Sequence, residues 1–240
     1  MHFLRNFLAA TAVAAFFPVA AHAQAGTNAE QQFSLLQTEQ QAGAALQGRE
    51  LTLEIDLAAS DIVLREEDGK QYLHYRMASN QVAEGWSWQP MADPAREDYY
   101  RFKYLPLQSL TVERGEYTHE DKIGEAQKMR IVWRYDYFLA FDNLYDFYPR
   151  RVDDEAGFDA ELPPLPRERV ALRARVVLGE TALSESTTFW KAIHAQPRDL
   201  TLKKRYFIGK LQLLEAFDRQ NGETLCRIER GGDGRCRRQP

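Results

Sequence analysis

Apolar and polar residues alternate with a period of two along much of the chain after residue 50. Leu51, Leu53, Ile55 and Leu57 alternate with polar residues, which is the pattern of a β-strand with one buried face. The other residues that carry this period are Tyr100, Phe102 and Tyr104; Leu110 and Val112; Met129, Ile131, Trp133, Tyr135 and Tyr137; and Val170, Leu172, Ala174 and Val176. Several strands with few helical stripes predict an all-β domain over residues 50–240, built as an antiparallel β-sandwich or a sandwich-like barrel.

Residues 61–77 predict a β-hairpin whose register follows from its turn. Asp68-Gly69 is a two-residue turn signal, and it pairs Glu67 with Lys70. The register then places two apolar pairs on one face, Leu64 with Leu73 and Ile62 with Tyr75, and three mostly polar pairs on the other, Arg65 with Tyr72, Val63 with His74 and Asp61 with Arg76.

Three further segments have a less regular pattern. Pro106 should break the strand around Tyr104 or place it at a sheet edge, because proline cannot donate a ladder hydrogen bond. The Pro-rich, acidic stretch 150–168 predicts a long loop, which either separates two β subdomains or crosses over within one. Residues 200–218 fit a strand or a helix. We favour a strand, and Asn221-Gly222 then either closes a hairpin or follows a helix end.

The first 49 residues differ from the rest of the chain. Residues 1–23 read as a secretory signal peptide, with Arg5 before an apolar run and Ala21-His22-Ala23 as the cleavage site. Residues 24–49 are rich in Gln and Ala and predict a tail or a loosely docked helix. We therefore expect an exported protein, periplasmic or secreted, with no transmembrane segment after signal removal.

Charge and cysteine content narrow the classes of partner. The net charge of −4 is mild and argues against a nucleic-acid partner. The two cysteines, Cys226 and Cys236, flank a Gly-rich stretch, and an exported protein meets an oxidising compartment. We therefore predict a Cys226–Cys236 disulfide.

Motifs for catalysis are incomplete. His119-Glu120 begins like a zinc-protease helix, but Ile123 stands where the second histidine should be. Ser87 lacks the glycine two residues later that a nucleophile elbow requires. We interpret His74, His119 and His194 as structural, and the acidic residues between Asp142 and Glu161 as a solvated loop rather than a calcium site. We therefore expect no catalytic residue, no metal and no cofactor, although an enzyme with dispersed carboxylates stays open.

Aromatic residues are concentrated between Trp86 and Tyr148. Trp133, Tyr135 and Tyr137 share one alternating face and are expected in the core. Trp86 and Trp88, between Gly85 and Pro90, are the better candidates for an exposed ligand-binding pair. The sequence favours a non-enzymatic binding or envelope-accessory protein with a protein partner or a glycan in the cell envelope. The alternative is a carbohydrate-binding protein or carbohydrate-active enzyme that uses an aromatic platform.

Overall fold

The computed structural model describes residues 28–55, 62–76, 102–120, 124–143, 146–147 and 157–231. Its larger sheet has the strand order β1-β7-β8-β5-β4, and β9 pairs with β8 beside this path. These strands are β1 (Glu50–Ile55), β4 (Lys103–Glu120), β5 (Ala126–Phe141), β7 (Val170–Trp190), β8 (Arg198–Asp218) and β9 (Thr224–Glu229). A smaller sheet has the order β2-β3-β6, with β2 (Ile62–Glu67), β3 (Lys70–Arg76) and β6 (Gly157–Leu162). One helix, α1 (Ala29–Gln41), precedes the strands, and a short 3-10 turn (Arg167–Arg169) leads into β7.

The prediction of an all-β, sandwich-like fold with an N-terminal helix is confirmed. One hydrophobic core contains side chains from both sheets, for example Leu73 and Leu162 of the smaller sheet and Leu172 and Leu214 of the larger one. Neither sheet closes on itself. Among the described strands, pairing is antiparallel except between β5 and β8, which run parallel.

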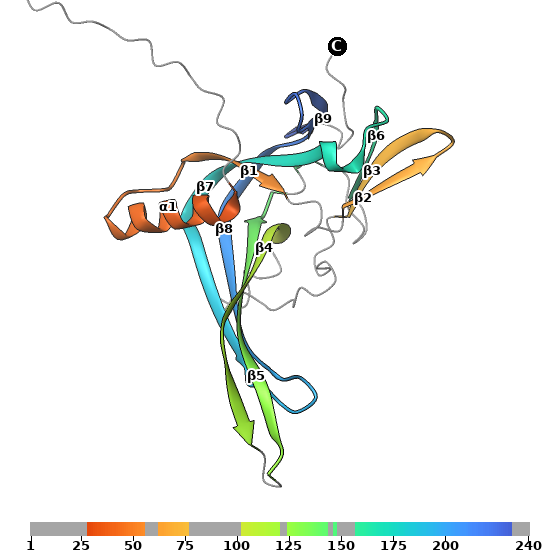
Figure 1. Cartoon of the computed structure of the whole chain (residues 1–240). Helices are drawn as coiled ribbons and strands as arrows, with labels where there is room; N and C mark the ends of the chain where they lie inside the picture. Colours follow the sequence, from red (N-terminus) through yellow and green to blue (C-terminus); the bar gives the residue numbers. More distant parts are fainter. Residues whose placement is uncertain are drawn as a thin grey trace, which may run out of the picture.

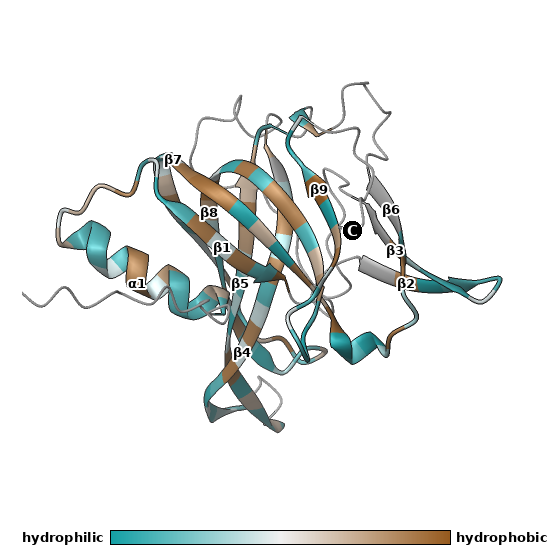
Figure 2. Cartoon of the chain, turned by 90° about the horizontal axis from the view of Figure 1, so that it is seen from above, coloured by the Kyte–Doolittle hydropathy of each residue, from teal (hydrophilic) through white to brown (hydrophobic). Residues whose placement is uncertain are grey.

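Helix α1 lies across one face of the long strands (Figure 1). Asn28 caps its first turn by accepting a hydrogen bond from the Gln31 amide at 2.9 Å. Figure 2 shows a mostly hydrophilic helix with a few apolar residues, so the packing of α1 against the sheet depends on few side chains. Phe33 and Leu36 are buried there, and the Phe33 ring meets Tyr137 and Phe207 edge-on. The Glu30 amide donates to the Gln108 side chain at 3.1 Å, which marks how far the helix reaches along β4.

The four longest strands, β4, β5, β7 and β8, extend well beyond the helix (Figure 1). We call this extension the arm, made of residues 111–120, 126–134, 183–190 and 198–203. On the β7 side, β1 pairs only with residues 172–177 and therefore ends before the arm begins. Gly209 sits where β7 and β8 approach closely, because a Cβ there would lie 2.3 Å from the Val177 carbonyl oxygen.

The hairpin prediction is confirmed in its register. The structure pairs Leu64 with Leu73 and Glu67 with Lys70, as the turn signal requires. Asp68 and Gly69 both have positive φ, 51° and 72°, which is the conformation of a two-residue hairpin turn. Leu73 is fully buried and Leu64 packs against the core. The side chains of Ile62 and His74 lie outside the described residues.

Three of the less regular segments are now placed. Pro106 does not end a strand: it lies within β4, which pairs only with β5 and so forms a sheet edge. The expected loop 150–168 is wrong in part, because β6 forms within it and pairs with β3. That pairing connects residues far apart in sequence, which the local Pro-rich pattern does not reveal. A subdomain break in this stretch stays a prediction. Residues 200–218 are a strand, as favoured, and the Asn221-Gly222 turn joins it to β9.

Candidate functional site

Several predicted residues lie outside the described part of the chain. Trp86, Trp88 and Ser87 are among them, as is the proposed signal peptide. Cys226 is buried on β9, but Cys236 falls in the undescribed C-terminal residues, so the disulfide stays a prediction. The described chain offers a different aromatic surface.

The aromatic side chains of β5 pass from buried to open along one face of the sheet. Tyr137 is fully buried beneath Phe33, which confirms its expected place in the core. Tyr135 is half-buried and packs against the edge of the core. Trp133, one row further from α1, belongs to neither hydrophobic core of the described residues, so the expectation of a core position is wrong for Trp133. The sequence period showed which side chains share a face but not where α1 stops covering it.

Three cations lie over these rings. The Arg205 guanidinium carbon lies 4.9 Å from the centre of the Tyr135 ring. The Arg114 guanidinium carbon and the Lys203 Nζ lie 5.0 Å and 5.6 Å from the centre of Trp133. Cation–π contacts contribute about 0.5–1 kcal/mol at exposed sites and about 2 kcal/mol when desolvated. We call Arg114, Trp133, Tyr135, Lys203 and Arg205 the aromatic–cation face.

A β-bulge positions Arg114 on this face. Glu113 pairs with Val132 and Gly115 pairs with Ile131, so Arg114 is the extra residue between two consecutive partners. Gly115 has φ of 146°, a conformation that glycine adopts without strain. Bulges bend a strand and re-aim a side chain. Here the bulge turns the Arg114 side chain over Trp133, where its Nη2 also donates to the Tyr135 hydroxyl at 3.4 Å.

Arg114 differs from the other two cations in its charge balance. Glu185 accepts hydrogen bonds from Lys203 at 3.1 Å and from Arg205 at 2.6 Å. Burial would raise the pKa of Glu185, but these hydrogen bonds hold it below its usual value, so the carboxylate stays charged. Burial likewise opposes the charge of Arg205, and its bonds to Glu185 and Tyr137 outweigh that effect and raise its pKa. Among the described residues, no carboxylate lies within ion-pair distance of Arg114.

Apolar side chains flank Trp133 in a single row across four strands. The register aligns Val112 of β4, Trp133 of β5, Thr201 of β8 and Phe189 of β7. Val112 is 38% exposed and Phe189 is 57% exposed. An exposed arginine that no carboxylate of the described residues partners therefore lies beside an open apolar row. This combination is suited to a partner with both anionic and apolar groups.

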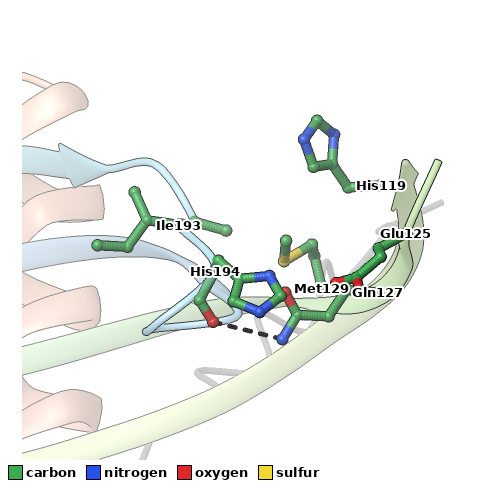
Figure 3. Close-up of a pocket in the computed structure, with 7 residues that line it drawn as sticks. His119, Glu125, Gln127, Met129, Ile193 and His194 are labelled. Atoms are coloured by element: carbon green, nitrogen blue, oxygen red, sulfur yellow. Dashed lines mark hydrogen bonds between the residues drawn. The ribbon is translucent and has the colours of Figure 1, made fainter. Parts of the chain in front are cut away.

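A cleft of about 340 Å³ lies near the far end of the arm (Figure 3). The residues that line it are His119, Glu125, Gln127, Met129, Ala192, Ile193 and His194. The Gln127 side chain donates to the His194 carbonyl at 3.4 Å, which joins the two strand connections. The fold thus brings His119 and His194 to one cleft, although they are 75 positions apart in sequence. Across the described ranges, no three His, Cys, Asp or Glu side chains gather as a metal site would require.

The opposite face of the sheet buries a polar group. Asp136 is fully buried and accepts hydrogen bonds from Ser109 Oγ at 2.7 Å and Arg134 Nε at 2.8 Å. Neighbouring Lys204 is also buried, and burial lowers its pKa to about 8 although the Asp136 charge acts in the other direction. Asp136 and Arg134 form an ion pair within the sheet, and we interpret this group as structural.

The described acidic residues between Asp142 and Glu161 are paired with cations. Asp142 pairs with Lys210, Asp146 with Arg230 at 2.7 Å, and Glu161 with Lys70 at 3.1 Å. Asp153, Asp154 and Glu155 lie outside the described residues, as does the side chain of Asp159. The carboxylates that can be placed are therefore engaged in separate ion pairs.

Comparison with known proteins adds no function. No protein-family description and no curated protein matches the chain. None of the helices in the described ranges combines the length and apolar character needed to cross a bilayer.

Sequence reasoning did not find Arg114, yet the chain carries a signal for it. Val112 and Tyr117 lie on the same face although five positions separate them, and a regular strand would place them on opposite faces. This change of alternation around Gly115 indicates a bulge.

Proposed function

We propose that this is an exported, non-enzymatic binding protein of the cell envelope that holds its partner on the aromatic–cation face. The main support for this proposal is the position of Arg114, which a β-bulge places over Trp133 with no described carboxylate beside it. On most protein surfaces, an arginine either pairs with a carboxylate or extends into water. Holding a guanidinium against a ring instead preserves its charge and its hydrogen-bond donors for a partner.

The shape of the face favours a partner larger than a buried small molecule. Small-molecule sites are concave, whereas the row from Val112 to Phe189 runs across the surface of a twisted sheet. The face is bounded by α1 at one end, where Gln108 accepts from the Glu30 amide. A protein segment or a glycan chain can lie along such a surface.

The second candidate is a carbohydrate-binding protein. Half-buried Trp133 and exposed Phe189 offer aromatic surface of the kind that packs against sugars, and Trp86 and Trp88 stay candidates for the same role. The two cations within 6 Å of Trp133 favour an acidic glycan over a neutral one in this case.

Site-specific photocrosslinking tests the proposal. A photoreactive phenylalanine analogue replaces Val112 in the full chain, which is expressed in the cells that export it. A matched variant carries the analogue at Leu35 on α1, which is similarly exposed at 54%. We expect a discrete adduct at position 112 that is absent at position 35 and is lost when Arg114→Gln is added. An adduct containing a protein supports the first candidate, whereas a glycan adduct supports the second.

Two results would contradict this proposal. Equal labelling at positions 112 and 35 would mean that the face selects no partner. An adduct that persists unchanged in Arg114→Gln and in Trp133→Ala would mean that the partner is held elsewhere.

A further inference from the structure

The end of β7 and its connection to β8 carry an unusual density of exposed apolar side chains. Five large hydrophobic residues are exposed in the described part of the chain, and three of them, Phe189, Trp190 and Ile193, fall within five positions. Ile193 is 59% exposed and Trp190 is 38% exposed. The other two, Leu35 and Val112, lie on α1 and β4.

Backbone hydrogen bonds hold this turn in one shape. Ile193 and Gln196 form a two-way bridge, with N···O distances of 3.1 Å and 2.9 Å. The Ala192 amide donates to the Asp199 carboxylate at 2.7 Å, and the Arg130 amide donates to the Pro197 carbonyl at 3.0 Å. The turn is thus tied to β8 and to β5, so Ile193, which lines the cleft, is held in a largely exposed position rather than left free to fold back onto the sheet.

The residue types match a membrane interface. Tryptophan prefers the boundary between lipid and water, because its ring is apolar and its N–H stays hydrated. Lys191, between Trp190 and Ile193, has its Nζ 6.0 Å from the centre of the Tyr117 ring. Because Lys191 is exposed, its charge can stay among lipid headgroups. A protruding turn that exposes an aromatic, a lysine and an aliphatic side chain is suited to shallow insertion into a bilayer surface.

Size separates a lipid surface from a protein partner. The exposed parts of Trp190 and Ile193 amount to roughly 200 Å² of apolar surface, taking about 150–250 Å² for a whole aromatic side chain. Phe189 is left out of this sum because it lies in the same row as Trp133, on the other face of the sheet. A stable protein interface buries about 800 Å² on each partner. Two side chains on a turn cannot reach that area by themselves, whereas a bilayer needs only the apolar side chains to enter it.

We propose that the β7–β8 turn docks the protein on a lipid bilayer surface by inserting Trp190 and Ile193. This inference is independent of the partner on the aromatic–cation face, because neither residue belongs to that face.

Vesicle co-sedimentation of the purified full chain tests this. The probes are phosphatidylcholine vesicles and vesicles in which part of that lipid is replaced by phosphatidylglycerol. We expect the protein to sediment with both. Ile193→Ser should lower the partition coefficient roughly tenfold, as expected for withdrawing the exposed part of an isoleucine from an apolar phase. Ile193→Leu should restore binding, and Leu35→Ser, a change of equal chemistry on α1, should leave it unchanged.

A change in binding is distinguished from unfolding by the melting temperature, which the replacement of solvent-exposed Ile193 should leave unchanged. Wild-type protein that fails to sediment with either vesicle would overturn the proposal. So would equal sedimentation of wild type and Ile193→Ser. A self-association in the absence of lipid that Ile193→Ser abolishes would assign the turn to a second copy of the chain instead.

Discussion

Replacing Phe33 by alanine removes the main side chain that seats α1 on the sheet. Phe33 is 1% exposed, and its ring centre lies 6.0 Å from that of Tyr137 and 5.5 Å from that of Phe207. Truncating a buried phenylalanine costs about 3–5 kcal/mol. That cost includes two edge-on ring pairs of about 0.5–1.5 kcal/mol each. We therefore expect Phe33→Ala to lower the free energy of unfolding by about 4 kcal/mol.

Leu35→Ala is the matched control on the same helix. Leu35 is 54% exposed, so its truncation should change the free energy of unfolding by less than about 0.5 kcal/mol. Urea unfolding followed by far-UV circular dichroism compares the two variants. Hydrogen exchange of residues 29–41 adds a local measurement, because a terminal helix can open before the sheet does. Phe33→Ala should accelerate exchange in α1 more than in β7 and β8.

The reasoning fails if both variants show the same urea midpoint and the same exchange in α1. Phe33 would then not hold the helix on the sheet. The end of the aromatic–cation face next to α1 would also have to be placed differently, because it depends on where α1 packs on the sheet.

Three further predictions concern stability. Leu73→Ala should cost about 2–4 kcal/mol, because Leu73 is fully buried in the hairpin, whereas exposed Arg65→Ala on the other face should cost less than about 0.5 kcal/mol; urea midpoints decide. Burial favours protonation of Glu215, but hydrogen bonds from Arg173, Thr224 and Arg227 outweigh it and hold the pKa of Glu215 at about 2. Because the folded-state pKa lies below the unfolded value, this stabilisation, on the order of 2–3 kcal/mol, is present above about pH 4.5 and is lost as the pH falls towards 2. Unfolding of wild type and Glu215→Gln from pH 7 to pH 2 should therefore converge at the acidic end, and a constant gap would contradict it. Gly209→Ala should destabilise by about 1–3 kcal/mol, because its Cβ would overlap the Val177 carbonyl, whereas Gly179→Ala meets only an ordinary 3.7 Å contact and should be tolerated in a thermal melt.

Local patterns in the sequence determined the elements whose signals lie within a few residues. The hairpin at Asp68-Gly69 formed in its predicted register, because a two-residue turn sets which residues face each other. The strand that carries Trp133 and Tyr137 was equally clear, because its period of two extends over nine residues. These predictions needed no information about distant parts of the chain.

The tertiary structure alone decided which strands become neighbours and which faces are covered. The parallel pairing of β5 with β8, and of β6 with β3 within an expected loop, joins segments that no local signal connects. A period of two shows that Trp133 and Tyr137 share a face, but α1 covers Tyr137 and leaves Trp133 half-open. The bulge that turns Arg114 over Trp133 exists only in the pairing of β4 with β5. Strand neighbours and covering elements depend on the free energy of the whole packed chain, so the candidate binding face emerges only once the chain has folded.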